Sequence, residues 1–256
     1  MTDTMRELEG RPALVTGASS GIGRQVALTL ASLGAPVTVT ARRSEPLELL
    51  VSEIQGAGGR AQAVVGDVRE ERHAAEAVSR TVEAYGGLTI LVNNAGVIGA
   101  GPVETTTTEE WDRVLDVDLK GPFLVCREAV PQMEDRPGAA VVNVSSVTGR
   151  RPYPGLAPYC VAKAGLDMFT KCLALEMAPH GVRVNAINPG VVRSILHTAT
   201  GTVPDDDAFL ERSTESHPLG FVGVRQDAAE LMPFLVWVRA GWISGGLFAV
   251  AGGRAV

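Results

Sequence analysis

Short runs of apolar, often β-branched residues alternate with longer stretches in which apolar positions recur at helical spacing. Several short runs are apolar almost throughout, which is typical of strands covered on both faces of a parallel sheet. The runs predict seven strands, at residues 13–16, 37–40, 62–65, 89–92, 140–144, 182–187 and 247–250. The stretches between them predict helices at residues 23–33, 47–55, 70–84, 158–178 and 226–238, and one more from a Thr107/Glu110 capping box to about residue 133.

Strand–helix alternation over the whole length predicts one doubly wound α/β domain, residues 1–256. Its seven-stranded parallel sheet would carry helices on both faces. The least regular stretch is 194–218, which contains the acidic run Asp205 to Asp207. A long loop in a compact domain is often an active-site lid, so we expect a substrate lid there.

The composition is that of an ordinary globular chain, with 256 residues, 45% hydrophobic and 20% charged. The net charge of −6 argues against a nucleic-acid or anionic-membrane partner, because both attract a basic surface. We find no signal-peptide pattern, and no apolar run reaches the roughly 18 residues of a membrane span. Three cysteines without a C-x-x-C pair predict no disulfide framework and a reducing cytoplasm, and four histidines without metal-ligand spacing predict no metal site.

The first predicted strand runs into a glycine-rich turn, Thr16 to Gly23, and a predicted helix follows. Glycine lets a phosphate approach the backbone, and the start of a helix offers free N–H groups to a pyrophosphate. The turn therefore predicts a dinucleotide site; the alternative is a tight turn that only packs helix against sheet. A P-loop is excluded, because no Gly-Lys-Ser or Gly-Lys-Thr closes the motif.

The end of the second predicted strand indicates which cofactor binds. An acid there would hold the ribose hydroxyls of NAD, whereas an arginine would pair with the 2′-phosphate of NADP. This chain has Arg42 and Arg43 and no acid at that point. A guanidinium suits a phosphate dianion, so we predict NADP(H) as the preferred cofactor, with NAD(H) possible. The alternative is that both arginines are ordinary surface residues.

Ser146, Tyr159 and Lys163 form a second group of polar residues. Tyr159 and Lys163 are four apart and share one face of a predicted helix, and Ser146 lies just past a predicted buried strand. Asn93 to Gly96 and Pro189 to Gly190 also follow strands, at the edge where ligands bind in an open α/β sheet.

With the glycine-rich turn and Asp67, these motifs make the sequence resemble the short-chain dehydrogenase/reductase family over essentially the whole chain. The resemblance implies a Rossmann-type fold and a nicotinamide cofactor that carries the hydride chemistry. It implies that Tyr159 is the general acid for ketone reduction, or the base for alcohol oxidation, and that Ser146 bonds the substrate oxygen. Lys163 would bind the nicotinamide ribose and lower the pKa of Tyr159.

The resemblance also implies the residues that bind the cofactor. Asp67 would bond the adenine ring, and Val192 and Ser194 would contact the nicotinamide amide and the phosphates. The expected set is Gly17, Ser19, Ser20, Gly21, Ile22, Gly23, Arg42, Arg43, Asp67, Val68, Asn94, Ala95, Gly96, Tyr159, Lys163, Pro189, Gly190, Val192 and Ser194.

One catalytic position departs from the family pattern. Where members usually carry an asparagine that helps hold a water in the proton relay, this chain has Asp118. An ionised aspartate cannot donate a hydrogen bond, but it can pair with Lys163 and raise the lysine pKa. We therefore count Asp118 among the catalytic residues, and a tuned, a slow and a degraded site remain open. The complete Ser146, Tyr159 and Lys163 set favours the first two, with a pH–rate profile shifted by Asp118.

Position after strands predicts the substrate pocket. Its expected residues are Ile98, Thr148, Tyr153, Leu156, Ile195 and Leu196. Arg150 and Arg151 would attract an anionic substrate, although adjacent loop arginines are more often only solvated. His197 and His217 lie in the expected lid, where an ordinary packing role is the simpler reading.

The preferred function is an NADPH-dependent reductase of a ketone or 3-oxoacyl-like substrate. The alternatives are an NAD(P)-dependent dehydrogenase of a secondary alcohol or sugar, and a cofactor-binding protein of low turnover. The resemblance further implies a homo-oligomer, most simply a tetramer. Ala251 and Phe221 stand where the family often has Asp and Arg, near the region that members use for subunit contacts.

Overall fold

The computed structural model describes residues 7–193 and 206–255. A parallel sheet of seven strands runs through the molecule in the order β3-β2-β1-β4-β5-β6-β7. The strands are β1 (Ala13–Thr16), β2 (Val37–Ala41), β3 (Ala61–Val65), β4 (Ile90–Asn93), β5 (Ala140–Val144), β6 (Arg183–Pro189) and β7 (Leu247–Val250). Every predicted strand is present, and the doubly wound fold is confirmed.

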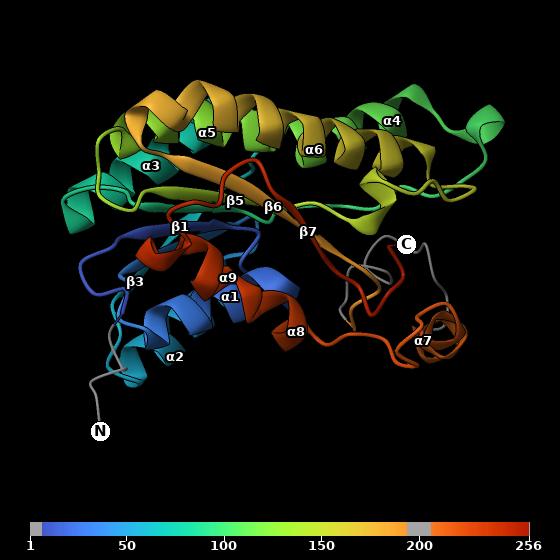
Figure 1. Ribbon diagram of the computed structural model, residues 1–256, viewed down its shortest axis with the longest axis horizontal. Helices are drawn as coiled ribbons and strands as arrows, with labels where there is room; N and C mark the ends of the chain where they lie inside the picture. Colours follow the sequence, from blue (N-terminus) through green and yellow to red (C-terminus); the bar gives the residue numbers. More distant parts are fainter. Residues whose placement is uncertain (1–6, 194–205, 256) are drawn as a thin grey trace.

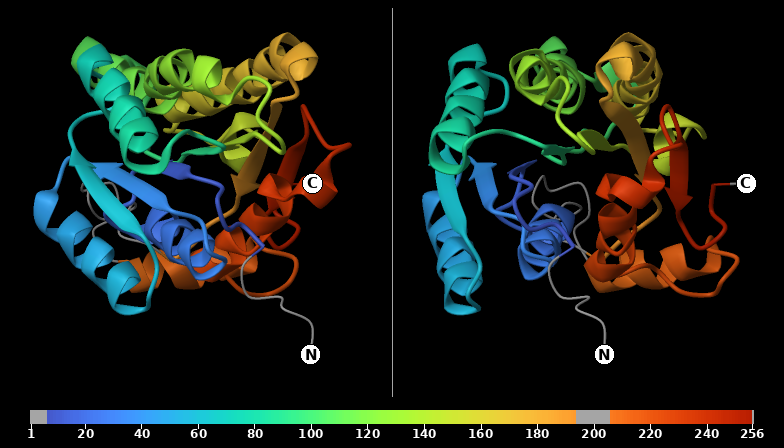
Figure 2. Two further views of the ribbon diagram at one scale, coloured as in Figure 1. Left: turned by 90° about the vertical axis from the view of Figure 1, so that its left-hand side faces the viewer. Right: turned by 60° about the vertical axis from the view of Figure 1, so that its left-hand side comes forward.

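Helices cover both faces of the sheet (Figures 1 and 2). One face carries α3 (Glu71–Tyr85), α4 (Thr108–Leu115), α5 (Gly121–Met133) and α6 (Ala157–Met177). The other carries α1 (Gly21–Ser32), α2 (Ser44–Gly56), α8 (Arg225–Ala229) and α9 (Leu231–Val236). The chain crosses from one face to the other where β1 neighbours β4, and the carboxyl ends of the strands open into a crevice at such a switch point.

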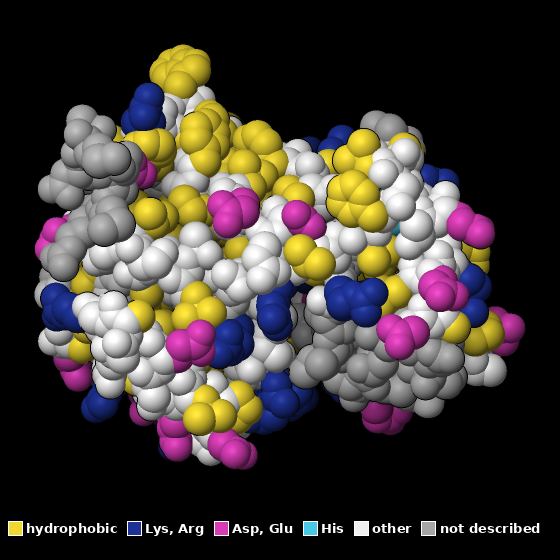
Figure 3. Space-filling model, turned by 90° about the horizontal axis from the view of Figure 1, so that it is seen from below, with side chains coloured by type: hydrophobic (Ala, Val, Ile, Leu, Met, Phe, Trp, Pro, Cys, Tyr) yellow, Lys and Arg dark blue, Asp and Glu magenta, His cyan; other side chains and the backbone are white. Residues whose placement is uncertain are grey.

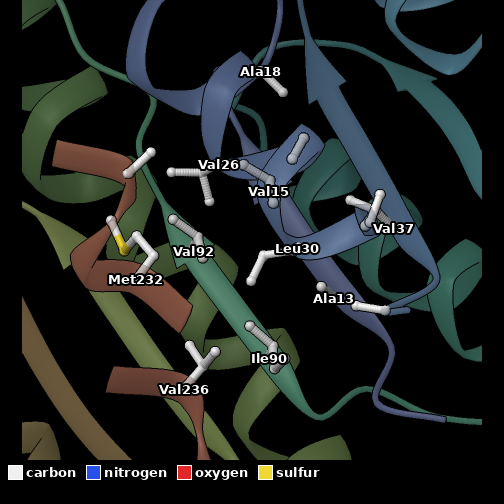
Figure 4. Packing of buried hydrophobic residues seen from close by; sticks show 14 of the residues in the cluster. Ala13, Val15, Ala18, Val26, Leu30, Val37, Ile90, Val92, Met232 and Val236 are labelled. Carbon is white, nitrogen blue, oxygen red and sulfur yellow. The ribbon is translucent and has the colours of Figure 1, made fainter. Parts of the chain in front are cut away.

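The sheet is buried because both layers of helices bring apolar side chains to it. Figure 4 shows Val26 and Leu30 of α1 and Met232 of α9 directed at Val15 and Val92 of the central strands. All five side chains are fully buried. Truncating such a side chain to alanine costs about 2–5 kcal/mol in an interior that cannot collapse around the gap. The central strands are therefore a rigid base for the turns at their ends.

The predicted helix from Thr107 to about residue 133 is present, from Thr108 to Met133, but it contains one irregular turn. Between α4 and α5 lies a π-helical turn, Asp116–Lys120, in which the Gly121 N–H bonds the Asp116 carbonyl five residues back. Pro122 follows directly, and a proline has no N–H with which to continue a regular α-helical ladder. The turn places Asp118 in the interior, where its side chain is fully buried.

The capping box predicted at the start of this helix is only half formed. The Thr107 side chain accepts a hydrogen bond from the Glu110 N–H at 3.1 Å. The Glu110 carboxylate instead holds Arg113, at 2.6 and 2.7 Å. An ion pair with a guanidinium replaces the bond that the carboxylate would have accepted from the cap.

The predicted helix at 226–238, by contrast, is broken into α8, α9 and the 3₁₀ turn Val238–Ala240. Pro233 cannot donate to the Ala229 carbonyl four residues earlier, so a continuous helix fails there. Of the expected lid, residues 194–205 lie outside the described residues, and the rest contains the helix α7 (Asp206–Glu215) rather than irregular chain. No helix in the described ranges has the length and apolar character needed to cross a membrane.

Candidate active site

A cavity of about 930 Å³ lies at the carboxyl ends of the strands, and the glycine-rich turn forms one wall. Gly17 has a φ of +66°, and a Cβ there would lie 2.6 Å from the Ala95 Cα. A Cβ on Gly23 would lie 2.2 Å from the Asn94 Nδ2. Glycine at these positions therefore lets the turn after β4 pack directly against the turn after β1.

Hydrogen bonds fix these two turns to each other. Thr16 Oγ1 accepts from the N–H groups of Asn94 and Ala95, at 3.0 and 3.1 Å. The Asn94 side-chain amide donates to the Thr16 and Gly17 carbonyls, at 3.0 and 3.1 Å. The turns after β1 and β4 therefore form a cradle that the hydrogen bonds of the protein itself hold in place.

The N-terminus of α1 closes this wall of the cavity. Ser20 precedes the helix and its side chain makes no capping bond, and no acidic residue occupies the first turn. The N–H groups and the positive end of the helix dipole are available to an anion. A dinucleotide pyrophosphate fits this donor set.

Two arginines and an aspartate line the end of the cavity beyond β2 and β3. Arg42 and Arg43 are exposed, and Arg43 donates to Ser19 Oγ at 3.1 Å. Asp67 accepts from Arg69 Nε and Nη2 at 3.0 and 2.8 Å. Burial favours the neutral carboxyl, but the bonds from Arg69 and the charge of Arg42 hold the pKa of Asp67 below its ordinary value. This end of the cavity combines two guanidinium groups with a carboxylate that stays ionised.

Ser146, Tyr159 and Lys163 meet at the middle of the cavity, as their positions after β5 and on α6 predict. Ser146 precedes a 3₁₀ turn, Val147–Gly149, and its Oγ accepts from the Thr148 N–H at 3.2 Å. Lys163 lies one helical turn beyond Tyr159, with its Nζ 5.5 Å from the phenol ring centroid. A serine hydroxyl and a phenol therefore converge on one point, with an ammonium beside them.

The backbone of Ser146 is held from the neighbouring strand. Asn188 on β6 donates to the Ser146 carbonyl at 3.0 Å and to Asp167 at 3.0 and 3.1 Å. Asp167 lies on α6 and is 5% exposed, and burial raises the pKa of its carboxyl. The buried side-chain amide of Asn188 thus joins β6 to Ser146 and to α6.

Asp118 lies behind the cavity, against Lys163. Its Oδ1 is 2.9 Å from Lys163 Nζ, and its Oδ2 accepts from the Val97 N–H at 2.9 Å. Lys163 Nζ also donates to the Val144 carbonyl at 3.0 Å. Burial opposes the charge on Lys163, but Asp118 and Tyr159 raise the lysine pKa above its ordinary value. Burial raises the pKa of Asp118, while Lys163 and the Val97 N–H act in the opposite direction.

The same environment acts on Tyr159. Burial raises the pKa of its phenol and the Asp118 carboxylate adds to that rise, whereas Lys163 and Ser146 lower it. Lys163 thus acts on the phenol in the expected direction, but burial outweighs it. The phenol is a group that keeps its proton at neutral pH.

The comparisons with known proteins decide the family. Residues 11–202 match the family described as short chain dehydrogenase. This chain belongs to that family. The match covers three quarters of the chain, and the seven-stranded parallel sheet agrees with the doubly wound fold predicted from the sequence.

Relatives extend the likeness over nearly the full length of the chain. It is 37% identical over 250 residues to 3beta-hydroxysteroid dehydrogenase 1 of Eggerthella lenta, covering 96% of this chain and 94% of that one. It is 34% identical over 249 residues to a 3-oxoacyl-acyl-carrier-protein reductase of Thermotoga maritima, covering 97% and 99%. A dehydrogenase/reductase structure from Sinorhizobium meliloti 1021 superposes with a TM-score of 0.90 at 35% identity, covering 97% and 96%. This short-chain dehydrogenase is therefore an NAD(P)-dependent oxidoreductase acting on CH–OH or C=O groups.

The cavity of this short-chain dehydrogenase collects most residues that the sequence singled out. Every expected cofactor residue lines it except Gly23, which packs under Asn94, and Ser194, which lies outside the described residues. Four expected substrate residues line it as well: Ile98, Thr148, Tyr153 and Leu156. Ile195, Leu196 and His197 lie outside the described residues, and Arg150 and Arg151 are not part of the lining.

His217 has a packing role in the described structure. Its Nε2 accepts from the Val191 N–H at 3.3 Å, and its Nδ1 lies 2.7 Å from the Ser213 carbonyl. With Nε2 as the acceptor, Nδ1 is the nitrogen that can donate to the Ser213 carbonyl. The ring braces the turn after β6 and lies beside Gly190 and Gly252.

Several residues of the lining were not predicted from the sequence, among them Glu110, Arg113, Pro154, Phe209 and Arg254. Glu110 and Arg113 belong to the same predicted helix as Asp118, but no local pattern assigned them to the site. Phe209 lies in the segment expected to be a lid, which was a signal, but Arg254 follows the last strand and no local pattern marks it.

Proposed function

We propose that this protein is an NADPH-dependent reductase of a ketone or 3-oxoacyl-like carbonyl. The observation that supports it most directly is the meeting of Ser146, Tyr159 and Lys163 in the same cavity as Arg42 and Arg43. The relatives include a 3-oxoacyl reductase and a hydroxysteroid dehydrogenase, both enzymes of ketone and secondary-alcohol chemistry.

The cavity suits a nicotinamide dinucleotide along its whole length. The cradle at Gly17 and the open start of α1 would hold the pyrophosphate, and Arg42 and Arg43 would hold a 2′-phosphate. When bound, the nicotinamide supplies the reducing equivalent to the carbonyl carbon.

Within this site Ser146 Oγ would donate a hydrogen bond to the carbonyl oxygen, and Tyr159 would give it a proton as the negative charge develops. Lys163 donates one N–H to the Val144 carbonyl and forms an ion pair with Asp118, and because an ammonium has three N–H groups a donor would remain for the ribose of the cofactor. The raised pKa of Tyr159 favours the protonated phenol, which is the form that donates the proton in reduction.

The test is the loss of nicotinamide absorbance with NADPH and NADH in parallel, over a panel of ketones, quinones and 3-oxoesters. Tyr159→Phe should abolish turnover, whereas Tyr85→Phe, whose hydroxyl bonds the Val37 carbonyl away from the cavity, should retain it. Turnover with NADH alone would contradict the arginine argument. Oxidation of alcohols without reduction of any ketone would favour the dehydrogenase alternative. The absence of turnover in either direction would favour a cofactor-binding protein of low turnover.

We also propose that the enzyme is a homotetramer. Apolar side chains protrude at one edge of the face shown in Figure 3. Among exposed apolar residues, Val238 and Trp242 precede the edge strand β7 and are 59% and 101% exposed, and Leu175 on α6 is 79% exposed. Large exposed apolar groups mark contact surfaces. Light scattering should give four chains, and Trp242→Glu or Leu175→Glu should yield smaller species; a wild-type monomer would contradict the proposal.

A reducing cytoplasm remains our proposed compartment. Cys126, Cys160 and Cys172 are all free thiols. Burial raises the pKa of Cys126 to about 12, so this thiol stays protonated and unreactive. Fractionation of the native host should place the protein with cytoplasmic enzymes, and recovery from an oxidising compartment would contradict this.

A further inference from the structure

Arg254 brings a cation into the active-site cavity from the end of the chain. It follows β7 and lines the cavity together with Tyr153 and Phe209. Its N–H bonds the Ala251 carbonyl at 2.8 Å, and the Gly252 carbonyl accepts from the Leu219 N–H at 3.1 Å. These bonds turn the chain after β7 back over the cavity.

Neutral groups hold the guanidinium of Arg254. Its Nε donates to the Tyr153 hydroxyl at 3.1 Å, and its Cζ lies 5.1 Å from the centroid of the same ring. Nη1 donates to the hydroxyl of Ser216. A guanidinium has five N–H donors, so the contacts with Tyr153 and Ser216 position the group and leave donors over.

Arg254 differs from the other cationic side chains that line the cavity in its charged partners. Arg113 pairs with Glu110 at 2.6 Å and Lys163 with Asp118 at 2.9 Å. Arg42 and Arg43 lie beyond β2, where the cofactor phosphate is proposed to bind. Within residues 7–193 and 206–255, no carboxylate forms an ion pair with Arg254.

We propose that Arg254 binds an anionic group of the substrate, and that the substrate is a carbonyl compound with a carboxylate remote from the carbonyl. A planar guanidinium matches a carboxylate through parallel N–H bonds, and the ring of Tyr153 keeps it in place. Arg151 lies near by, 5.9 Å from the Tyr153 centroid, and donates to the Arg254 carbonyl. Arg254 lines the cavity, whereas Arg150 and Arg151, which were considered for this role from the sequence, do not.

The first experiment rests on the proposed reductase function. Oxo acids of increasing chain length are compared with their methyl esters, using NADPH and the full-length enzyme. The wild type should prefer the best acid, and Arg254→Met, which keeps an apolar stem, should lower kcat/KM for that acid about 10- to 100-fold while leaving its ester within about twofold. Arg254→Lys should recover part of the loss, and Arg151→Met should change the acid-to-ester ratio little. An acid-to-ester ratio unchanged in Arg254→Met overturns the proposal.

A binding experiment separates this inference from the reductase function. Calorimetry with NADPH present measures hexanoate and hexanamide against the wild type and Arg254→Met. Hexanoate binding that is stronger than that of hexanamide, and is lost in Arg254→Met, supports the subsite even if no carbonyl is reduced. Equal hexanoate binding by both proteins, or none by the wild type, overturns it, whatever the turnover experiments show.

Discussion

Asp118 Oδ1 lies 2.9 Å from Lys163 Nζ, and both side chains are almost completely buried, at 0% and 4% exposed. The π-helical turn between α4 and α5 directs Asp118 inward at this point. A buried ammonium normally needs a partner, because removing its charge from water costs much more free energy than leaving it at the surface. The aspartate supplies that partner directly and adds a negative charge near Tyr159.

Asp118→Asn should move the pH–rate profile to lower pH. The carboxylate raises the pKa of Tyr159, so its removal lowers that pKa and the phenol loses its proton at a lower pH. Reduction needs the protonated phenol, and its alkaline decline should therefore begin earlier; alcohol oxidation, which needs the phenolate, should become active at lower pH. The measurement is kcat/KM against pH at saturating cofactor.

Asp116→Asn is the matched control for this experiment. Asp116 lies on the same turn and pairs with Lys120 at 3.4 Å on the surface, with 39% of its side chain exposed. Its removal should leave the profile in place, because solvent screens surface pairs. An Asp118→Asn profile and rate identical to wild type would show that Asp118 does not tune Tyr159.

Arg42→Ala combined with Arg43→Ala should weaken NADPH binding by about 10- to 100-fold, because charge-assisted hydrogen bonds to the 2′-phosphate are lost. NADH lacks that phosphate, and its dissociation constant should change little. Fluorescence titration of both cofactors gives the ratio. Arg24→Ala serves as control, since Arg24 pairs with Glu53 and is not part of the cavity lining. Equal loss for NADPH and NADH would contradict the assignment.

The sequence predicted the sheet and the converging site because both depend on local pattern. Near-continuous apolar runs marked the strands, and the motifs at their carboxyl ends met because parallel strands share one ligand-binding edge. Arg254 escaped prediction because its place depends on how the chain after β7 folds back. That path is set by two hydrogen bonds, from the Leu219 N–H to the Gly252 carbonyl and from the Arg254 N–H to the Ala251 carbonyl.

Helix irregularities were the other features that pattern reasoning did not predict. The predicted helix to about residue 133 is present from Thr108 to Met133, but apolar periodicity gave no sign of the π-helical turn at Asp116–Lys120. At Pro233 the missing N–H interrupts the helix predicted at residues 226–238. The π-helical turn directs Asp118 toward Lys163, and the interruption separates α8 from α9.

His73 should make the fold less stable in mild acid. Its Nε2 lies 2.7 Å from Thr40 Oγ1, and burial lowers the pKa of the ring although Glu76, Glu70 and Asp67 act in the opposite direction. The unfolded chain then binds a proton more readily than the folded one. The free energy of unfolding should therefore be at its full value above about pH 6.5 and decline as pH falls below it.

Urea unfolding across this pH range measures the effect. His73→Gln keeps an amide for Thr40 but cannot titrate, so its decline should be shallower than that of the wild type. His180→Gln replaces a histidine that is 44% exposed and should keep the wild-type slope. Identical slopes in all three proteins would show that His73 does not contribute.

Gly17→Ala should lower both the stability of the fold and the affinity for the cofactor. Gly58→Ala is the control that separates backbone strain from the clash of the added Cβ with Ala95. Both glycines have positive φ, +66° and +83°, so alanine at either site strains the backbone by about 1 kcal/mol or more. At Gly58 nothing lies within 4 Å of the added Cβ, whereas at Gly17 it would meet the Ala95 backbone at 2.6 Å.

The extra effect of Gly17→Ala therefore measures the contact between the turns after β1 and β4. We expect a lower Tm than for Gly58→Ala and a loss of NADPH affinity that Gly58→Ala does not share, because the displaced turn no longer directs its N–H groups into the cavity. Thermal unfolding with and without NADPH gives both quantities. If the two variants lost equal stability and both kept wild-type affinity, the turns would not need their close approach to bind the cofactor.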